Sequence, residues 1–164
     1  MTKSDAIVDT NVLVVASGGA RHASTDCVRR SIARLRRVRE ECCLLLDDKD
    51  TILREYRKQF DQSSTQAVGF QFLLWIHDNQ ANSEYCRKVL VTHDETLGFA
   101  EFPDHEDLET FDWDDRVFVA VALGSCTGAV ILNATDTDWW DHREALNRHG
   151  VKIDFVCPEL MRTS

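Results

Sequence analysis

Short apolar runs alternate with helix-patterned segments along this chain, and this alternation limits the fold more than any other feature. The runs that we expect to form strands are 6–9, 42–46, 88–92, 129–133 and 152–156. The segments that we expect to form helices are 25–41, 51–60 with Asp50 or Thr51 as its cap, 65–77, 114–123 and 138–149. The segment through Gly98 and Pro103 is expected to be an edge hairpin with a loop. Strands joined by helices predict an α/β fold with a mostly parallel sheet covered on both faces.

The length and the apolar content set the size of the expected core. The chain has 164 residues, of which 43% are hydrophobic, and this is enough for one compact domain over residues 1–164. No stretch approaches the roughly 18 apolar residues of a membrane-spanning helix, so we expect no membrane partner. The first residues lead into a short apolar run without a small-residue cleavage site. We therefore expect no secretory signal and a cytoplasmic protein.

The cysteines form no C-x-x-C pair, and most of them lie inside apolar runs, where a reduced cysteine behaves as a small hydrophobic residue. We therefore expect free thiols and no zinc. The six residues concerned are Cys27, Cys42, Cys43, Cys86, Cys126 and Cys157.

Acidic residues recur where the expected topology would bring them to one edge of the sheet. Asp9 closes the first strand, Asp136 follows the fourth strand by a short turn, Asp115 lies in the first turn of a helix, and Glu55 lies near the start of another. Ligands of parallel α/β sheets bind outside the carboxyl ends of the strands. A carboxylate cluster at that edge predicts a site for a hard divalent cation, and such cations commonly catalyse the hydrolysis of phosphodiesters.

Each acid also has a simpler interpretation. Asp115 could complement a helix N-terminus, Asp136 could be an ordinary cap, and Glu55 could pair with Lys58 along an exposed helix face. Asp9 is harder to explain in this way, because a carboxylate continuous with a buried strand is costly to desolvate without a cation or hydrogen-bond donors. The convergence of all four favours the cation site.

The charge distribution bears on nucleic-acid binding. The net charge of −9 argues against a phosphate-rich partner, but seven of the 19 basic residues fall between Arg21 and Arg39. There Arg30, Arg34 and Arg37 share one side of a helix, which is either a solvated face or a nucleic-acid contact surface. Ten acids and no Lys or Arg occupy 94–115, so the molecule is charge-segregated.

Tryptophans flank the proposed acids and have two interpretations. Trp113, Trp139 and Trp140 could stack on bases, as aromatic side chains do in single-strand binding proteins. Aromatic residues beside helix starts more often belong to the core, and we favour that interpretation.

Four blocks of the sequence resemble the signature blocks of PIN domains, in the expected order and across nearly the whole chain. They are 8–13 (VDTNVL), 53–56 (LREY), 115–122 (DRVFVAVA) and 131–138 (ILNATDTD). PIN domains are three-layer α/β/α sandwiches with a central, mostly parallel sheet, here of about five strands. Most are ribonucleases that depend on Mg²⁺ or Mn²⁺. The first and third blocks are specific in combination, whereas the Glu block alone is weak.

The resemblance implies roles for individual residues. Asp9, Glu55, Asp115 and Asp136 would form the catalytic, metal-binding quartet, with Asp138 as a supplementary ligand, and the nearby Asn11 would orient these groups. The implied partner is RNA. Many PIN domains are toxins of toxin–antitoxin pairs, and many dimerise, so an antitoxin and a homodimer are implied as well.

Departures from the family pattern leave an alternative open. Many relatives carry Thr two residues before the acid of the fourth block, where this chain has Ala134, and Thr135 or Asn133 is the nearest substitute. The doublet of Asp114 and Asp115 leaves the third ligand ambiguous by one residue, although the spacing favours Asp115. The alternative is a catalytically degenerate module of the same fold that binds RNA or a protein partner.

Overall fold

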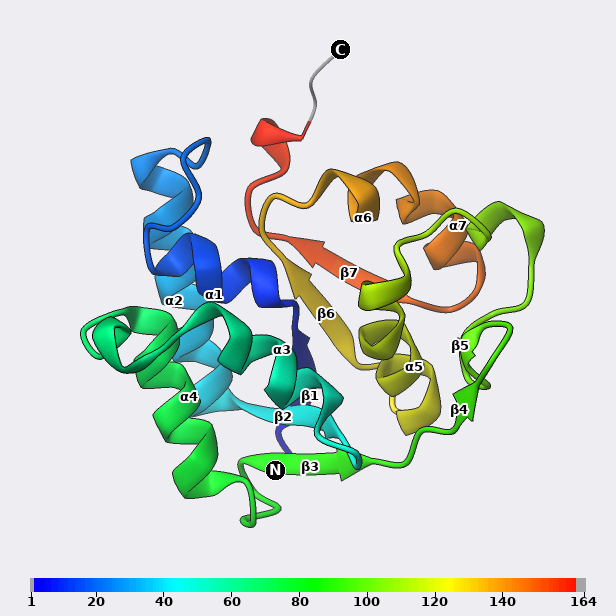
Figure 1. Cartoon of the computed structure of the whole chain (residues 1–164), viewed down its shortest axis with the longest axis horizontal. Helices are drawn as coiled ribbons and strands as arrows, with labels where there is room; N and C mark the ends of the chain where they lie inside the picture. Colours follow the sequence, from blue (N-terminus) through cyan, green and yellow to red (C-terminus); the bar gives the residue numbers. More distant parts are fainter. Residues whose placement is uncertain (1, 162–164) are drawn as a thin grey trace.

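The computed structural model describes residues 2–161, and five parallel strands form its central sheet in the order β3-β2-β1-β6-β7 (Figure 1). Ile7 of β1 lies opposite Ile131 of β6, and Ala6 lies opposite Leu44 of β2. A separate antiparallel pair joins the two short strands β4 and β5. The strands are β1 (Ser4–Val8), β2 (Cys42–Asp47), β3 (Cys86–Val89), β4 (His93–Asp94), β5 (Gly98–Phe99), β6 (Val130–Asn133) and β7 (Lys152–Phe155).

Helices cover the sheet from two sides. The α1 to α4 group lies on one side, and α5 packs against β1, β2 and β6 from the other, the side that also carries α6 and α7 (Figure 1). The α-helices are α1 (Thr10–Ala16), α2 (Thr25–Glu41), α3 (Thr51–Gln59), α4 (Val68–Asn79), α5 (Arg116–Ser125), α6 (Thr137–Asp141) and α7 (Arg143–Arg148). The short 3₁₀ turns are η1 (Gln62–Ser64), η2 (Glu106–Leu108), η3 (Trp113–Asp115) and η4 (Pro158–Leu160). The α/β fold with a parallel central sheet between helices is therefore confirmed.

The core consists of the strand interiors and the inner faces of the helices. Parallel strands are buried on both faces and therefore consist of continuous apolar runs. The runs 6–8 and 43–46 are buried throughout, as is the α5 segment 116–122. No helix among the described residues has both the length and the apolar character needed to cross a membrane.

Two predicted segments differ from the observed helices. Helix α1, which is not among the expected helices, begins directly after Asp9, because the Asp9 side chain accepts a hydrogen bond from the N–H of Asn11 and caps that helix. The single helix expected over 138–149 is divided at His142 into α6 and α7. The edge hairpin expected near Gly98 is the β4–β5 pair.

The expectation that all cysteines are free thiols was wrong for one pair. Cys27, in the first turn of α2, forms a disulfide with Cys157, which follows β7. The two lie 130 residues apart, so no local spacing could have indicated the pairing. The remaining cysteines, Cys42, Cys43, Cys86 and Cys126, are free.

The direction in which the chain leaves β1 and β6 defines the functional edge of the sheet. These two strands are neighbours, yet β1 leads through α1 and α2 to β2, whereas β6 leads through α6 and α7 to β7 on the opposite side. Such a reversal is a topological switch point, where the carboxyl ends of the strands border a crevice. Asp9 and Asp136 follow these two strand ends.

Asp50 is the N-cap residue of α3, as the sequence pattern predicts, but the carboxylate that accepts from the first amides is that of Asp47. Asp50 makes no side-chain cap hydrogen bond, whereas the buried Asp47 carboxylate accepts from the backbone N–H groups of Lys49 (3.2 Å), Thr51 (2.9 Å) and Ile52 (2.9 Å). A carboxylate at the end of β2 thus satisfies the first amides of α3.

We expect Asp47→Ala to lower the free energy of unfolding by about 2–3 kcal/mol, because it leaves the N–H groups of Thr51 and Ile52 without a partner. Urea denaturation measures the change. The control is Asp26→Ala, which removes an exposed acid from the first turn of α2 and should cost less than about 1 kcal/mol. Equal losses in the two variants would contradict the capping role.

Candidate functional site

Asp9 is the most buried acid of the predicted quartet. Its side chain is 2% exposed, and its N–H donates to the carbonyl of Leu132 (3.0 Å), which continues the pairing of β1 with β6. Its Oδ2 accepts from the backbone N–H of Asn11 and from Nδ2 of Asn133, both at 3.2 Å. No Lys, Arg or His in the described part of the chain forms an ion pair with this carboxylate. Neutral donors alone therefore hold a buried acid at the switch point.

Asp115 and Asp136 reach the same place from different elements. Asp115 ends η3 and immediately precedes α5, and Asp136 caps α6 by accepting from the N–H of Asp138 (3.0 Å). Asp114 is exposed, whereas Asp115 is partly buried and interacts electrostatically with Asp9 and Asp136. The structure thus favours Asp115 over Asp114 as the residue that faces the cluster.

The three carboxylates destabilise one another's charge. Burial, and then the negative charges of Asp115 and Asp136, raise the pKa of Asp9 well above its usual value. Burial and the charge of Asp136 raise the pKa of Asp115 to about 8. Burial also raises the pKa of Asp136. A cation placed among these oxygens would oppose these shifts, because opposite charge favours the ionised form.

Amide and hydroxyl side chains fix the positions of the acids. Asn133 bridges two of them, because its Nδ2 donates to Asp9 and its Oδ1 accepts from the N–H of Asp136 (3.1 Å). Asn11 holds the loop after β6: its Oδ1 accepts from the N–H of Thr135 (2.7 Å), and its Nδ2 donates to the Thr135 hydroxyl (3.3 Å). Asn11, which was predicted to orient the acids, therefore orients that loop.

Thr135 and Asn133, the candidate substitutes for the hydroxyl missing at Ala134, both belong to this network. The Thr135 Oγ1 also lies 3.0 Å from Nε2 of His22, whereas Ala134 is fully buried. Sequence reasoning treated Asn133 only as a substitute for a missing hydroxyl and did not anticipate its bridge between two acids. The sequence signal for this role is that Asn133, a polar residue, ends the buried apolar run of β6.

The carboxylate of Asp138 contacts groups outside the cluster. Its Oδ2 accepts from the N–H of Asp112 (2.9 Å), and its Oδ1 lies 3.2 Å from Nδ1 of His142. Its charge contributes to the raised pKa of Asp115, so it is near the three acids. These contacts suit a residue that positions α6 more than a direct ligand.

Glu55 is the member of the predicted quartet that the structure does not place with the others. It lies on α3, is partly exposed, and pairs with Lys58 at 2.7 Å, as its simpler interpretation had predicted. It is not among the main charges that raise the pKa of Asp9 or Asp115. Its role as a ligand stays a prediction from the resemblance.

The arginines predicted to contact nucleic acid are all engaged within the chain. Arg30 bonds the carbonyl of Val156 (2.9 Å) and pairs with Glu159, so it fixes the segment after β7. Arg34 pairs with Asp154 of β7. Arg37 pairs with Glu41 one turn further along α2 (3.2 Å). These pairs account for much of the basic face, and its RNA contacts stay a prediction.

Arg116 is a buried residue that sequence reasoning did not single out. Its guanidinium donates to the carbonyls of Leu97 (3.2 Å), Glu109 (3.1 Å) and Phe111 (3.1 Å) and lies over the ring of Phe102, 4.3 Å from its centroid. Burial lowers its pKa. It therefore anchors the acid-rich segment 94–115 directly beside Asp115, and no local pattern identifies an arginine with carbonyl partners.

No family model, curated protein or solved structure that was compared with this chain matches it. The interpretation of the site therefore depends on its geometry and on the four sequence blocks.

Proposed function

We propose that this protein is a PIN-like, metal-dependent nuclease, and specifically an endoribonuclease that hydrolyses phosphodiester bonds in RNA. The observation that carries the proposal is the meeting of Asp9, Asp115 and Asp136 outside the carboxyl ends of β1 and β6. They come from three separate elements and share a partly buried place, and no Lys, Arg or His among residues 2–161 forms an ion pair with any of the three. A role as the toxin of a toxin–antitoxin pair is part of the proposal, by resemblance alone.

The donor chemistry of these residues suits Mg²⁺ or Mn²⁺, and an ion would draw together carboxylate oxygens that do not all lie within 4.8 Å of one another. All three side chains offer carboxylate oxygens, the ligands that hard divalent cations prefer, and their mutual repulsion is the cost that such a cation would offset. When bound, the ion would supply Lewis-acid activation of water and of the phosphodiester. Asn133 would keep Asp9 and the start of α6 side by side, because it bonds both.

Trp113 supports RNA as the substrate class. It is 49% exposed and lies two residues before Asp115 in η3, whereas Trp139 is fully buried and belongs to the core. The guanidinium of Arg116 lies 5.0 Å from the centroid of the Trp113 ring and steadies it. An exposed ring beside the carboxylates offers a surface on which an unpaired base can stack.

The second candidate function is a degenerate PIN-like module that binds RNA or a protein without cleaving it. Two observations favour it: Glu55 pairs with Lys58, and the ten acids of 94–115 border the candidate site and would repel RNA phosphates. Such a segment suits a basic protein partner.

Calorimetry with Mn²⁺ on metal-free protein, followed by an assay on mixed-sequence RNA, distinguishes the two functions. We expect Mn²⁺ binding that depends on Asp9, and RNA cleavage that stops when EDTA removes the metal. DNA of the same sequence serves as the matched substrate. Absence of both binding and cleavage would favour the degenerate module.

A further inference from the structure

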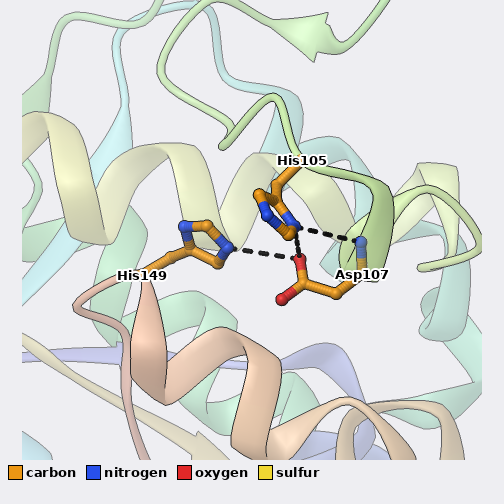
Figure 2. A group of neighbouring side chains, drawn as sticks. All are labelled: His105, Asp107 and His149. Carbon is orange, nitrogen blue, oxygen red and sulfur yellow. Dashed lines mark hydrogen bonds and ion pairs between the residues drawn. The ribbon is translucent and has the colours of Figure 1, made fainter.

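A second group of metal-binding side chains lies outside the carboxylate cluster. His105 caps η2, Asp107 lies within it, and His149 follows α7, 42 residues after Asp107 in the sequence (Figure 2). Each offers one ligand atom, and the three atoms lie within 4.8 Å of one another. The group therefore joins the acid-rich segment to the C-terminal part of the chain.

The two imidazoles converge on the same carboxylate oxygen. Nδ1 of His105 lies 2.6 Å and Nε2 of His149 lies 3.2 Å from Oδ1 of Asp107, and the two ring centroids are 5.1 Å apart (Figure 2). Zinc–nitrogen bonds of about 2.0–2.1 Å place the ligand atoms of a tetrahedral site about 3.3 Å apart. To admit an ion, Nδ1 of His105 and Oδ1 of Asp107 would move apart by about 0.7 Å, and the two imidazoles would approach each other.

The first of these contacts needs a proton or a metal ion between its two atoms. An unprotonated Nδ1 and a carboxylate oxygen both present lone pairs, so a separation of 2.6 Å is stable only when Nδ1 carries a hydrogen or when a metal ion lies between them. Nδ1 of His105 also accepts the N–H of Asp107 at 3.2 Å, which places a lone pair on that nitrogen. A metal ion that replaced this long hydrogen bond would satisfy both atoms.

Neighbouring groups hold the ligands in place. Arg148 donates to Oδ2 of Asp107 at 3.0 Å, which directs Oδ1 toward the two rings. The backbone N–H of His149 donates to the carbonyls of Ala145 (3.3 Å) and Leu146 (3.1 Å), so the residue is fixed at the end of α7. Such supporting contacts orient ligands and strengthen metal sites.

We propose that His105, Asp107 and His149 bind a transition-metal ion of the Zn²⁺ class. Two imidazoles and one carboxylate suit such an ion better than Mg²⁺, and they leave a fourth position for water. The expectation of no zinc considered the cysteines alone. The ion would tie η2 to the end of α7 and fix the acid-rich segment against the body of the protein.

Calorimetric titration of untagged, metal-free protein with Zn²⁺ tests the proposal. We expect a Zn²⁺ site in the wild type at which binding is at least tenfold weaker in His105→Gln and in His149→Gln. Two controls should bind as the wild type does at this site: His77→Gln, which changes an exposed histidine of α4, and Asp9→Asn, which alters the carboxylate cluster. Circular dichroism and thermal unfolding in EDTA check that every variant is folded.

The outcomes separate this site from the other candidates. Absence of Zn²⁺ binding, or binding as tight as that of the wild type in both histidine variants, would overturn the proposal. Loss of the Zn²⁺ site in Asp9→Asn alone would assign the ion to the carboxylate cluster. Thiolate charge-transfer bands in the Co²⁺-substituted protein would assign it to a cysteine. Failure of Mn²⁺ binding or of RNA cleavage would leave the Zn²⁺ result unaffected.

Discussion

Replacing Asp115 by Asn is expected to reduce RNA cleavage by about 100-fold or more. Asn keeps the size of the side chain but removes a charged oxygen from the place where Asp9 and Asp136 also converge, and a bound metal supplies several kcal/mol of transition-state stabilisation. Single-turnover cleavage of RNA in Mn²⁺ measures the change, and calorimetry measures the accompanying loss of Mn²⁺ affinity.

Asp114→Asn is the matched control for this variant. It makes the same chemical change one residue earlier, at an exposed side chain, and should retain cleavage within about threefold. The pair also decides the ambiguity of the acidic doublet. Loss of cleavage in Asp114→Asn but not in Asp115→Asn would assign the ligand to Asp114. Wild-type cleavage in both variants would exclude both residues from the proposed site.

The stability of Asp115→Asn distinguishes lost chemistry from lost structure. Burial and like charges raise the pKa of Asp115 from 3.8 to about 8, so in metal-free protein the folded state holds a proton that the unfolded chain has released. The free energy of unfolding should therefore fall as the pH rises from about 4 to 8, and this decrease should be smaller in Asp115→Asn. A variant less stable than the wild type at neutral pH in EDTA would contradict this account.

The parallel sheet could be predicted from the sequence because its strands are buried on both faces. The runs 6–8 and 43–46 have no polar interruption, and the segments between them keep helical spacing. Helix α1 was missed because Asp9 indicates a turn and a cap equally well. The cap of α3 was assigned to the nearest polar residues, although Asp47 reaches the same amides from the end of β2.

The candidate site was predictable as far as it follows from topology. Asp9 and Asp136 follow neighbouring parallel strands, and any such sheet brings those ends together. The position of a side chain on a helix face is less constrained by topology. Glu55 accordingly forms an ion pair with Lys58 and does not join the cluster. The disulfide and the carbonyl contacts of Arg116 join residues that only the folded chain brings together.

Replacing Arg116 by Met is expected to lower the free energy of unfolding by about 3–5 kcal/mol. Met preserves the apolar stem but removes the guanidinium that lies over Phe102, and it leaves the carbonyls of Leu97, Glu109 and Phe111 without their charged donor. Each such bond contributes about 1.5–3 kcal/mol. Urea denaturation measures the loss. Hydrogen exchange should show faster exchange concentrated in 94–115, because that segment depends on the guanidinium.

Two further variants separate the donors of Arg116 from its charge. Arg116→Lys keeps the charge with fewer donors in a different geometry, so its loss of stability should be intermediate. Arg36→Met makes the same substitution at an exposed position of α2 and should change the free energy of unfolding by less than about 0.5 kcal/mol. If Arg116→Lys is as stable as the wild type, the charge alone suffices. If exchange quickens evenly across the chain in Arg116→Met, the residue supports the whole core and not this segment.

Anchoring of the segment would also connect stability with activity, because Asp115 is the residue directly before Arg116 and should lose its position when that anchor is removed.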